Sequence, residues 1–231
     1  MRRLLVVLAV LMTAACVTQS RPKTFSGTIA TPPAGSTIIV MAPDIQLSLL
    51  SAAGAPEPRA DWSAAAQSNI AAALASNLQT QGHRPLALDP STQMAGRSGQ
   101  LIRLHDAVAS SIILFNYANV RLPTHRDSFN WTLGPGTREI QTQHGARYAL
   151  FIGGGGSYAS AGRIATSVIV SVLFRTVATT GGGQQLYMSL IDLETGDIIW
   201  FNVASAGTGV DMREAEGARQ LVNQVLEDSP L

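Results

Sequence analysis

Hydrophobic positions along this chain alternate between strand-like and helix-like patterns. The clearest strand pattern runs from Gln184 to Val203, where two runs of apolar, β-branched and aromatic residues flank the polar segment 194–197 (ETGD). Such residues are typical of strands, and a short polar segment between two of them predicts a tight hairpin. Gly196 stands where that turn needs a positive φ, which glycine adopts at no steric cost. We therefore expect an antiparallel hairpin in the middle of a sheet.

The first half of the chain predicts a strand, a helix and a second strand. Residues 36–41 (STIIVM) form an apolar run typical of a buried strand. The alanine-rich segment that follows Asp61 predicts a helix that Asp61 caps and Gly82 ends. Residues 84–88 (RPLAL) predict a short strand at a sheet edge, because proline cannot donate to a neighbouring strand. This order predicts a parallel pair joined by a right-handed crossover. The apolar stripe of the helix consists of Trp62, Ala66, Ile70, Ala73, Leu74 and Leu78.

The second half predicts two more helices around a further strand. Residues 100–120 begin with helical periodicity, but the later IILFNY fits either a helix or a strand. Residues 137–144 predict a short helix closed by Gly145, and residues 146–152 (ARYALFI) predict a strand. Asp211 is placed to cap a final amphipathic helix that covers the sheet. The apolar stripe of that helix consists of Met212, Ala215, Leu221, Val222 and Val225.

A glycine-bounded apolar segment lies between that strand and the hairpin. The segment 164–174 is shorter than a helix that crosses a bilayer, and Arg175 follows it. The pattern favours a buried helix or strand between glycine hinges. The alternative is a segment that inserts into a membrane or into an oligomer interface. For that alternative, the candidate contact residues are Gly153, Gly154, Gly155, Gly156, Tyr158, Val168, Val172 and Phe174.

Taken together, the elements predict an α/β fold. We expect a mixed sheet in two or three layers, with an N-terminal β-α-β unit and a C-terminal antiparallel hairpin followed by a helix. A chain of 231 residues suits one domain with a sizeable core. We expect residues 36–231 to form this domain. Residues 16–35 are rich in Thr, Ser, Pro and Gly and are expected to form a tether.

The N-terminus predicts export. A basic start, an apolar run from Leu4 to Met12 and the small residues 13–15 (TAA) describe a secretory signal over residues 1–15. The next residue, Cys16, is the chain's only cysteine. A cysteine directly after small residues resembles the lipobox of bacterial lipoproteins, which implies that Cys16 is lipidated and becomes the first mature residue. Val17 is not the aspartate that this family uses for inner-membrane retention, so the resemblance implies the outer membrane, on its periplasmic side.

Charge excludes some partners. Removal of residues 1–15 leaves 216 residues and takes away Arg2 and Arg3, so 14 basic residues face 15 acidic ones and the net charge is −1. The arginines are scattered, and Lys23 is the only lysine. A near-neutral chain without a basic patch argues against binding to nucleic acid.

Two sequence motifs, one of glycines and one around a serine, are present only in incomplete form. Gly154, Gly156 and Ala159 match G-x-G-x-x-A after a strand, but no acidic residue follows until Asp192, so a flexible or bulged strand end is favoured over a dinucleotide site. No P-loop is present, and no cofactor is expected.

The segment 158–162 (YASAG) lacks the first glycine of a nucleophile elbow. The two serines of this region, Ser157 and Ser160, therefore fit local turns better than catalysis.

The remaining polar candidates have structural explanations. Four histidines are available, of which His83 and His144 adjoin predicted helix ends; none has the companions that a metal or a triad needs. Asp192, Glu194 and Asp197 crowd the hairpin turn, where acidic residues cap the backbone and keep an edge soluble. Trp200 is predicted to lie in the core. For Trp131 the sequence allows two positions, one in the core and one on a binding surface. The other two histidines are His105 and His125.

The hairpin carries one further resemblance. The segment 192–200 (DLETGDIIW) resembles the D-L-x-T-G-x-x-x-W hairpin of the curli-secretion lipoprotein, of penicillin-binding-protein activator lipoproteins and of related lipoproteins with a TolB N-terminal-like α/β fold. The matching fold-marker residues are Asp192, Leu193, Thr195, Gly196 and Trp200. The resemblance implies a fold, and curli-type pores insert hairpins into the outer membrane.

We therefore expect a non-enzymatic outer-membrane lipoprotein. Its partners would be the membrane, through the lipid anchor, and an envelope protein, with oligomerisation possible. The alternatives are a lipid-anchored hydrolase that uses Ser157 or Ser160, and a subunit of an oligomeric secretion pore.

Overall fold

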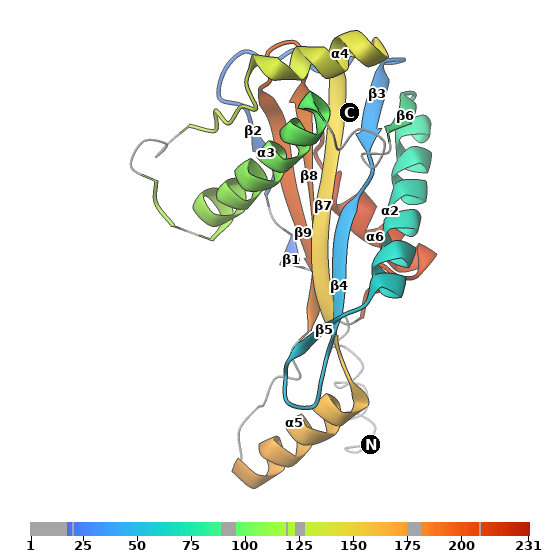
Figure 1. Ribbon diagram of the computed structural model, residues 1–231, viewed down its shortest axis with the longest axis vertical. Helices are drawn as coiled ribbons and strands as arrows, with labels where there is room; N and C mark the ends of the chain where they lie inside the picture. Colours follow the sequence, from blue (N-terminus) through green and yellow to red (C-terminus); the bar gives the residue numbers. More distant parts are fainter. Residues whose placement is uncertain are drawn as a thin grey trace, which may run out of the picture.

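A computed structural model shows one α/β unit built on a single long sheet (Figure 1). Within the described part of the chain, nine strands form this sheet, in the order β1-β9-β8-β7-β3-β6 with β2, β4 and β5 beside that path. The predicted fold class is confirmed. The structure describes residues 18–19, 21–88, 96–118, 120–122, 128–174, 182–207 and 209–231.

The middle of the sheet is antiparallel. Strand β7 (Tyr148–Ala159) pairs with β8 (Gly183–Asp192), which pairs in turn with β9 (Ile198–Ala206). The predicted hairpin is therefore confirmed as β8 and β9. Gly196 has φ +85° in the turn, where an added Cβ would meet the backbone of Gly134.

The β-α-β unit is also confirmed. Strand β3 (Thr37–Met41) lies parallel to the edge strand β6 (Arg84–Leu88), and α2 (Ala60–Thr80) connects them. Gly82 ends the helix as predicted, with φ +84°. Beyond β3 the chain bends at Pro43 and continues beside β7 as β4, so β3 and β4 share one side of β7. Strand β4 is Asp44–Leu50, and β5 (Pro56–Pro58) pairs back onto it.

Helices cover both faces of the sheet, which gives three layers (Figure 1). On one face lie α2 and α6 (Ala215–Val225), and on the other lies α3 (Arg97–Ile112). Alternate residues of β3 pack into the hydrophobic cores on the two faces of the sheet. Ile38 and Val40 pack on the side of α2 and α6, and Ile39 and Met41 pack on the side of α3. The π-helix η2 (Ile113–Tyr117) extends α3, so the ambiguous IILFNY is helical. The remaining short elements are the 3-10 helix η3 (Pro135–Thr137) and α4 (Arg138–His144), closed by Gly145 in the left-handed conformation.

Both predicted N-caps are wrong. Helix α2 begins one residue before Asp61, which instead forms a bidentate ion pair with Arg59, at 2.7 and 3.0 Å. Helix α6 begins at Ala215 after a turn in which the carboxylate of Asp211 accepts the Arg213 amide at 2.9 Å. Ala215 is consequently exposed, and Gly217 and Ala218 take its place in the core. The other predicted members of this stripe, Met212, Leu221, Val222 and Val225, are fully buried.

The N-terminal segment pairs with the free side of β9. Strands β1 (Thr18–Gln19) and β2 (Lys23–Thr24) run antiparallel to β9. Further along, the Tyr148 hydroxyl donates to the Ala30 carbonyl at 3.1 Å. Part of the segment expected to be a tether is thus bonded to the sheet, while the boundary between tether and domain stays a prediction.

Candidate interaction surface

Helix α5 (Ala161–Phe174) projects from the end of the sheet, beyond the last residues of β7 (Figure 1). Its first turn is fixed to the β4–β5 hairpin. The Ser160 amide donates to the Leu50 carbonyl at 3.0 Å, and the Ser160 hydroxyl accepts the Arg163 amide at 3.1 Å. Ser160 is therefore the N-cap of α5, a structural role that its position before an apolar helix could have predicted. A Cβ on Gly162 would lie 3.2 Å from the Ala52 side chain, so the helix start approaches the hairpin closely.

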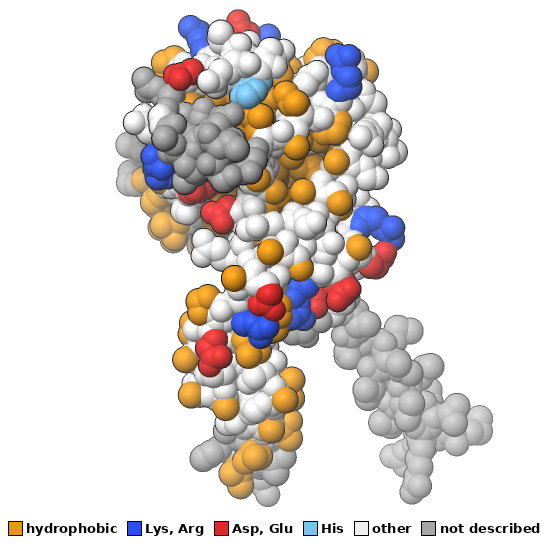
Figure 2. All heavy atoms as spheres, turned by 45° about the vertical axis from the view of Figure 1, so that its right-hand side comes forward, with side chains coloured by type: hydrophobic (Ala, Val, Ile, Leu, Met, Phe, Trp, Pro, Cys, Tyr) orange, Lys and Arg blue, Asp and Glu red, His pale blue; other side chains and the backbone are white. Residues whose placement is uncertain are grey.

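The prediction that this segment is buried is wrong. Ile164 is 47% exposed, Val168 56%, Ile169 57% and Leu173 69%. Among the described residues, these four belong to a group of only seven large hydrophobic side chains that are exposed. We call these four residues the apolar face of α5. Figure 2 shows hydrophobic side chains gathered on this projecting part of the molecule.

The polar side of α5 faces the protein itself. Ser167 is buried, and its hydroxyl donates to the Ile164 carbonyl at 2.9 Å. Arg163 is the one charged residue of α5, and it is half-buried. Its Nη1 atom lies 3.0 Å from the position that a Cβ would take on Gly54. The helix thus exposes its large apolar side chains while Ser167 and Arg163 are more covered, although the polar Thr166 is exposed as well, which differs from an ordinary surface helix.

The glycine run before α5 is not a hinge. Gly153 to Gly156 lie inside β7, paired with β4 on one side and β8 on the other. The predicted flexible or bulged strand end is therefore wrong. Gly153 is buried beneath the Tyr187 ring, into which an added Cβ would project, whereas the other three glycines are half-buried. Glycine in a strand interior commonly marks such a close approach. Contact of these glycines with a partner stays a prediction.

Tyr158, another candidate contact residue, is buried in a stack of cationic and aromatic side chains. The Arg213 guanidinium lies 3.7 Å from the Tyr158 ring centroid and 4.3 Å from that of Trp62, and Arg59 covers the Trp62 ring at 4.3 Å. The Tyr158 hydroxyl lies 2.7 Å from Gln184 Oε1. Burial raises the pKa of Tyr158 well above its ordinary value. Tyr158 therefore packs within the chain, between β7 and the N-terminus of α2.

Asp211 completes this stack. Burial raises the pKa of its carboxyl, but hydrogen bonds from Arg213 and Tyr158 outweigh burial, so the net pKa is lowered. The Tyr158 hydroxyl lies 2.8 Å from Asp211 Oδ1, and Arg213 makes bidentate contacts with the carboxylate. The charges in this cluster are matched within the chain, which leaves no net charge for a ligand.

Two acidic residues of the hairpin turn, Asp192 and Glu194, form ion pairs within the chain. Asp192 is buried, and Arg147 Nη2 donates to its Oδ2 at 2.7 Å while Nη1 lies 2.9 Å from Glu194 Oε2. Hydrogen bonding to Asp192 raises the pKa of Arg147 above its ordinary value. Asp192 Oδ1 also accepts the Glu194 amide, as expected for a turn. Sequence reasoning missed Arg147, because its pairing depends on the register of β7 with β8.

Among the fold-marker residues, Leu193 and Trp200 are fully buried. The Thr195 hydroxyl accepts the Asp197 amide within the turn. Trp131 is half-buried and donates from Nε1 to Asn116 at 3.0 Å. Trp200 thus lies in the core as predicted.

The structure places His105 beside Ser189, a serine that the sequence analysis did not single out. His105 Nε2 lies 2.8 Å from Ser189 Oγ, and Nδ1 lies 3.6 Å from Asp106. Both His105 and Ser189 are buried, between the rings of Phe151 and Tyr187. Desolvation lowers the pKa of His105 despite the nearby Asp106. A hydroxyl buried in this way is out of reach of a substrate, so the contact is a satisfied pair of the core.

The other chemical candidates do not converge. Ser157 lies within β7, paired with Ser48 and Gly183, and Gly154, Gly156 and Ala159 share that strand instead of forming a phosphate-binding turn. No group of three or more His, Cys, Asp or Glu side chains within the described ranges could hold a metal ion. Of the described helices, none is long and apolar enough to cross a membrane. Outside the described residues lie Cys16, His125 and the side chains of Val172 and Phe174.

Comparisons with known proteins add the following. Neither the protein-family models nor the curated proteins gave a match. Among solved structures, the chain is similar to the PelC dodecamer from Paraburkholderia phytofirmans, with 16% identity over 94% of this chain and 97% of that one, and a TM-score of 0.39. Lipoprotein GNA1162 from Neisseria meningitidis is 13% identical over 83% and 96%, with a TM-score of 0.36. The LpoB C-terminal domain from Salmonella enterica is 14% identical over 78% and 86%, with a TM-score of 0.31. Scores this low carry no argument about function.

Proposed function

We propose that this chain is an outer-membrane lipoprotein, anchored through Cys16 and facing the periplasm, that acts as a non-enzymatic interaction factor in envelope assembly or transport. The apolar face of α5 supports the part of the proposal that places this chain in contact with another component of the envelope, whether membrane or protein. Soluble monomers rarely expose a contiguous apolar surface unless it contacts something. Here the helix is capped and fixed to the β4–β5 hairpin, so the exposed face belongs to the folded protein.

The anchor is supported by the N-terminal sequence. The signal over residues 1–15 is followed directly by the chain's only cysteine, at the position that lipid attachment requires. Several acyl chains on Cys16 would hold the protein stably at a membrane without a spanning helix.

The anchor is tested by labelling growing cells with an alkyne-tagged palmitate and separating their membranes. The wild-type chain and a Val17→Ala control should carry the label and sediment with the outer membrane. The Cys16→Ala variant should lose both the label and the sedimentation. Unchanged labelling of Cys16→Ala would refute lipidation at this residue.

The interaction role is tested by chemical crosslinking in intact envelopes, followed by mass spectrometry of the products. A specific envelope protein should be recovered with the wild-type chain. Recovery of no specific partner, together with a hydrolytic activity that Ser160→Ala abolishes while folding is retained, would replace the proposal with the anchored hydrolase. Crosslinks only between copies of this chain would favour the oligomeric pore.

A further inference from the structure

The structure also indicates what the apolar face of α5 contacts. We propose that this face rests on the surface of the lipid leaflet that holds the acyl chains of Cys16. The inference depends on the anchor proposed above and identifies the partner of the same surface. Four features of the described residues carry it: where the chain enters the sheet, how long α5 is, what its face is made of, and where the charges lie.

The chain enters the sheet near the end from which α5 projects. Thr18 pairs with Ser205, Ser205 with Gln185, and Gln185 with Gly155, so these four residues lie at one level across the sheet. Gly155 is four residues before the end of β7 at Ala159, which corresponds to about 13 Å at the rise of a strand. Strand β1 runs antiparallel to β9, and β9 runs toward this end. The N-terminal end of β1, at Thr18, therefore points toward the end of the sheet that carries α5.

The short length of chain between Cys16 and Thr18 limits how far the anchor can lie from this end of the sheet. Cys16 is two residues before Thr18, and two residues span at most about 7 Å. Sideways, β1 is separated from β7 by β9 and β8, which amounts to about 14 Å at the usual spacing of strands. A lipid chain on Cys16 enters the membrane at its surface, so a short tether of this length brings the end of the sheet that carries α5 to the same surface.

The length of α5 fits a helix that lies along a membrane. Its 14 residues span about 21 Å, which is shorter than the hydrocarbon layer of about 30 Å. A helix lying in the interface needs an apolar side toward the acyl chains and a satisfied polar side. In this chain the polar side is satisfied by the protein, because Ser167 and Arg163 turn toward it.

The composition of the face, as far as its side chains are described, is compatible with lipid. Its four members, Ile164, Val168, Ile169 and Leu173, are all aliphatic. Protein interfaces are enriched in aromatic residues, methionine and arginine, which fill pockets and form directed hydrogen bonds. A lipid leaflet offers neither pockets nor fixed partners, and large apolar side chains such as leucine are among those that interfacial helices bury in it.

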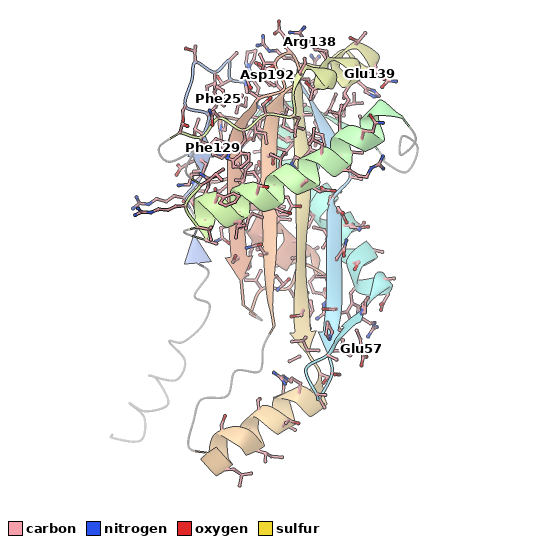
Figure 3. All side chains as sticks on the ribbon, turned by 60° about the vertical axis from the view of Figure 1, so that its left-hand side comes forward. Phe25, Glu57, Phe129, Arg138, Glu139 and Asp192 are labelled. Atoms are coloured by element: carbon pink, nitrogen blue, oxygen red, sulfur yellow. The ribbon has the colours of Figure 1, made fainter. Side chains whose placement is uncertain are left out.

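Charged side chains lie at both ends of the molecule, including the ion pairs Arg59–Asp61 and Arg213–Asp211 near the end that carries α5 (Figure 2). Figure 3 shows Arg138, Glu139 and Asp192 at the end of the sheet away from α5, whereas Glu57 on β5 lies above α5. Seating the apolar face on lipid keeps the exposed Arg138 and Glu139, at the far end of the sheet, in water (Figure 3). The acyl chains and the helix together give two attachment points, which fix the orientation of the sheet to the membrane and direct α4 and the hairpin turn toward the periplasm.

Depth-dependent fluorescence tests the proposal with the lipidated full chain, purified from membranes and returned to vesicles. Because Cys16 is the only cysteine and its thiol is blocked by lipid, a second cysteine can be labelled alone with the environment-sensitive dye NBD. The test variants are Ile169→Cys and Leu173→Cys, and the control is Gln143→Cys, which is exposed on α4. In phosphatidylcholine vesicles the two α5 labels should show blue-shifted emission, and brominated phosphatidylcholine should quench them. The control label should show neither effect.

The other outcomes would overturn the proposal in different ways. An α5 label that emits as in water would show that nothing covers the face. A blue-shifted label that brominated lipid does not quench, in a sample that chemical crosslinking converts to multimers, would show that a second copy covers it. Failure of the anchor is seen separately, since unlipidated protein would carry no palmitate and would leave a free thiol at Cys16 for the dye.

Discussion

Replacing Gly154 by alanine should destabilise the protein, because the glycine run lies inside a paired strand. A Cβ at Gly154 would stand 2.5 Å from the Gln185 carbonyl oxygen and 3.3 Å from the Leu186 Cα, both of which are backbone atoms of β8. Neither can move without disturbing the pairing of β7 with β8. Forcing a methyl group into such a space typically costs about 1–3 kcal/mol.

A matched control is available one strand away. Gly183 belongs to β8, and a Cβ there would lie 3.6 Å from the Ala206 carbonyl oxygen, an ordinary contact. Gly183→Ala should therefore be neutral or should stabilise by about 0.4–1 kcal/mol, since alanine restricts the unfolded chain more than glycine does.

Urea unfolding, followed by tryptophan fluorescence, measures both variants. With a urea dependence of about 1–3 kcal/mol per molar, a loss of about 2 kcal/mol for Gly154→Ala lowers the midpoint by roughly 1 M. The midpoint of Gly183→Ala should stay at or above that of wild type. A Gly154→Ala midpoint equal to that of wild type would refute the close packing of β7 and would restore the interpretation of the glycines as a flexible hinge.

Three further predictions concern other parts of the molecule. Arg147→Met should cost about 1–3 kcal/mol in urea unfolding, because it leaves the buried carboxylate of Asp192 without its cation; an unchanged midpoint would contradict this role. Desolvation lowers the pKa of His105 in the folded protein below its value in the unfolded chain. The neutral imidazole therefore stabilises the fold above about pH 6.5, and this stabilisation is lost as the pH falls and the unfolded chain takes up a proton. The urea midpoint should decline as the pH is lowered from about 7.5 to 5, and it should decline less in His105→Gln. Leu173→Ser should leave the unfolding midpoint unchanged within about 0.5 kcal/mol, because the side chain is 69% exposed; a core-like loss would show that the face is covered within the monomer.

The elements with regular periodicity could be predicted from sequence. In α2, apolar residues at helical spacing include Ile70, Leu74 and Leu78, and all three are fully buried. The hairpin followed from two β-branched and aromatic runs around a turn with Gly196 at positive φ. In both cases, residues close together along the chain carry enough information to specify the local structure.

Other features could not be predicted because they depend on distant segments. The glycines of β7 are required by the Tyr187 ring and by the neighbouring backbone, both of which belong to segments distant in sequence. Arg147 meets Asp192 only through the register of β7 with β8. The exposure of α5 reverses the usual inference from hydrophobicity to burial, because hydrophobicity cannot distinguish a side chain that packs in the core from one that contacts another molecule.

The most direct test of the account is photocrosslinking in growing cells. A photoreactive amino acid placed at Leu173, on the apolar face of α5, is compared with one at Gln143, on the exposed side of α4. Mass spectrometry then identifies what each position captures. The account predicts that Leu173 captures phospholipid and that Gln143 captures envelope protein or water. Capture of protein alone at Leu173, with no phospholipid adduct, would contradict the proposal that this face rests on the membrane.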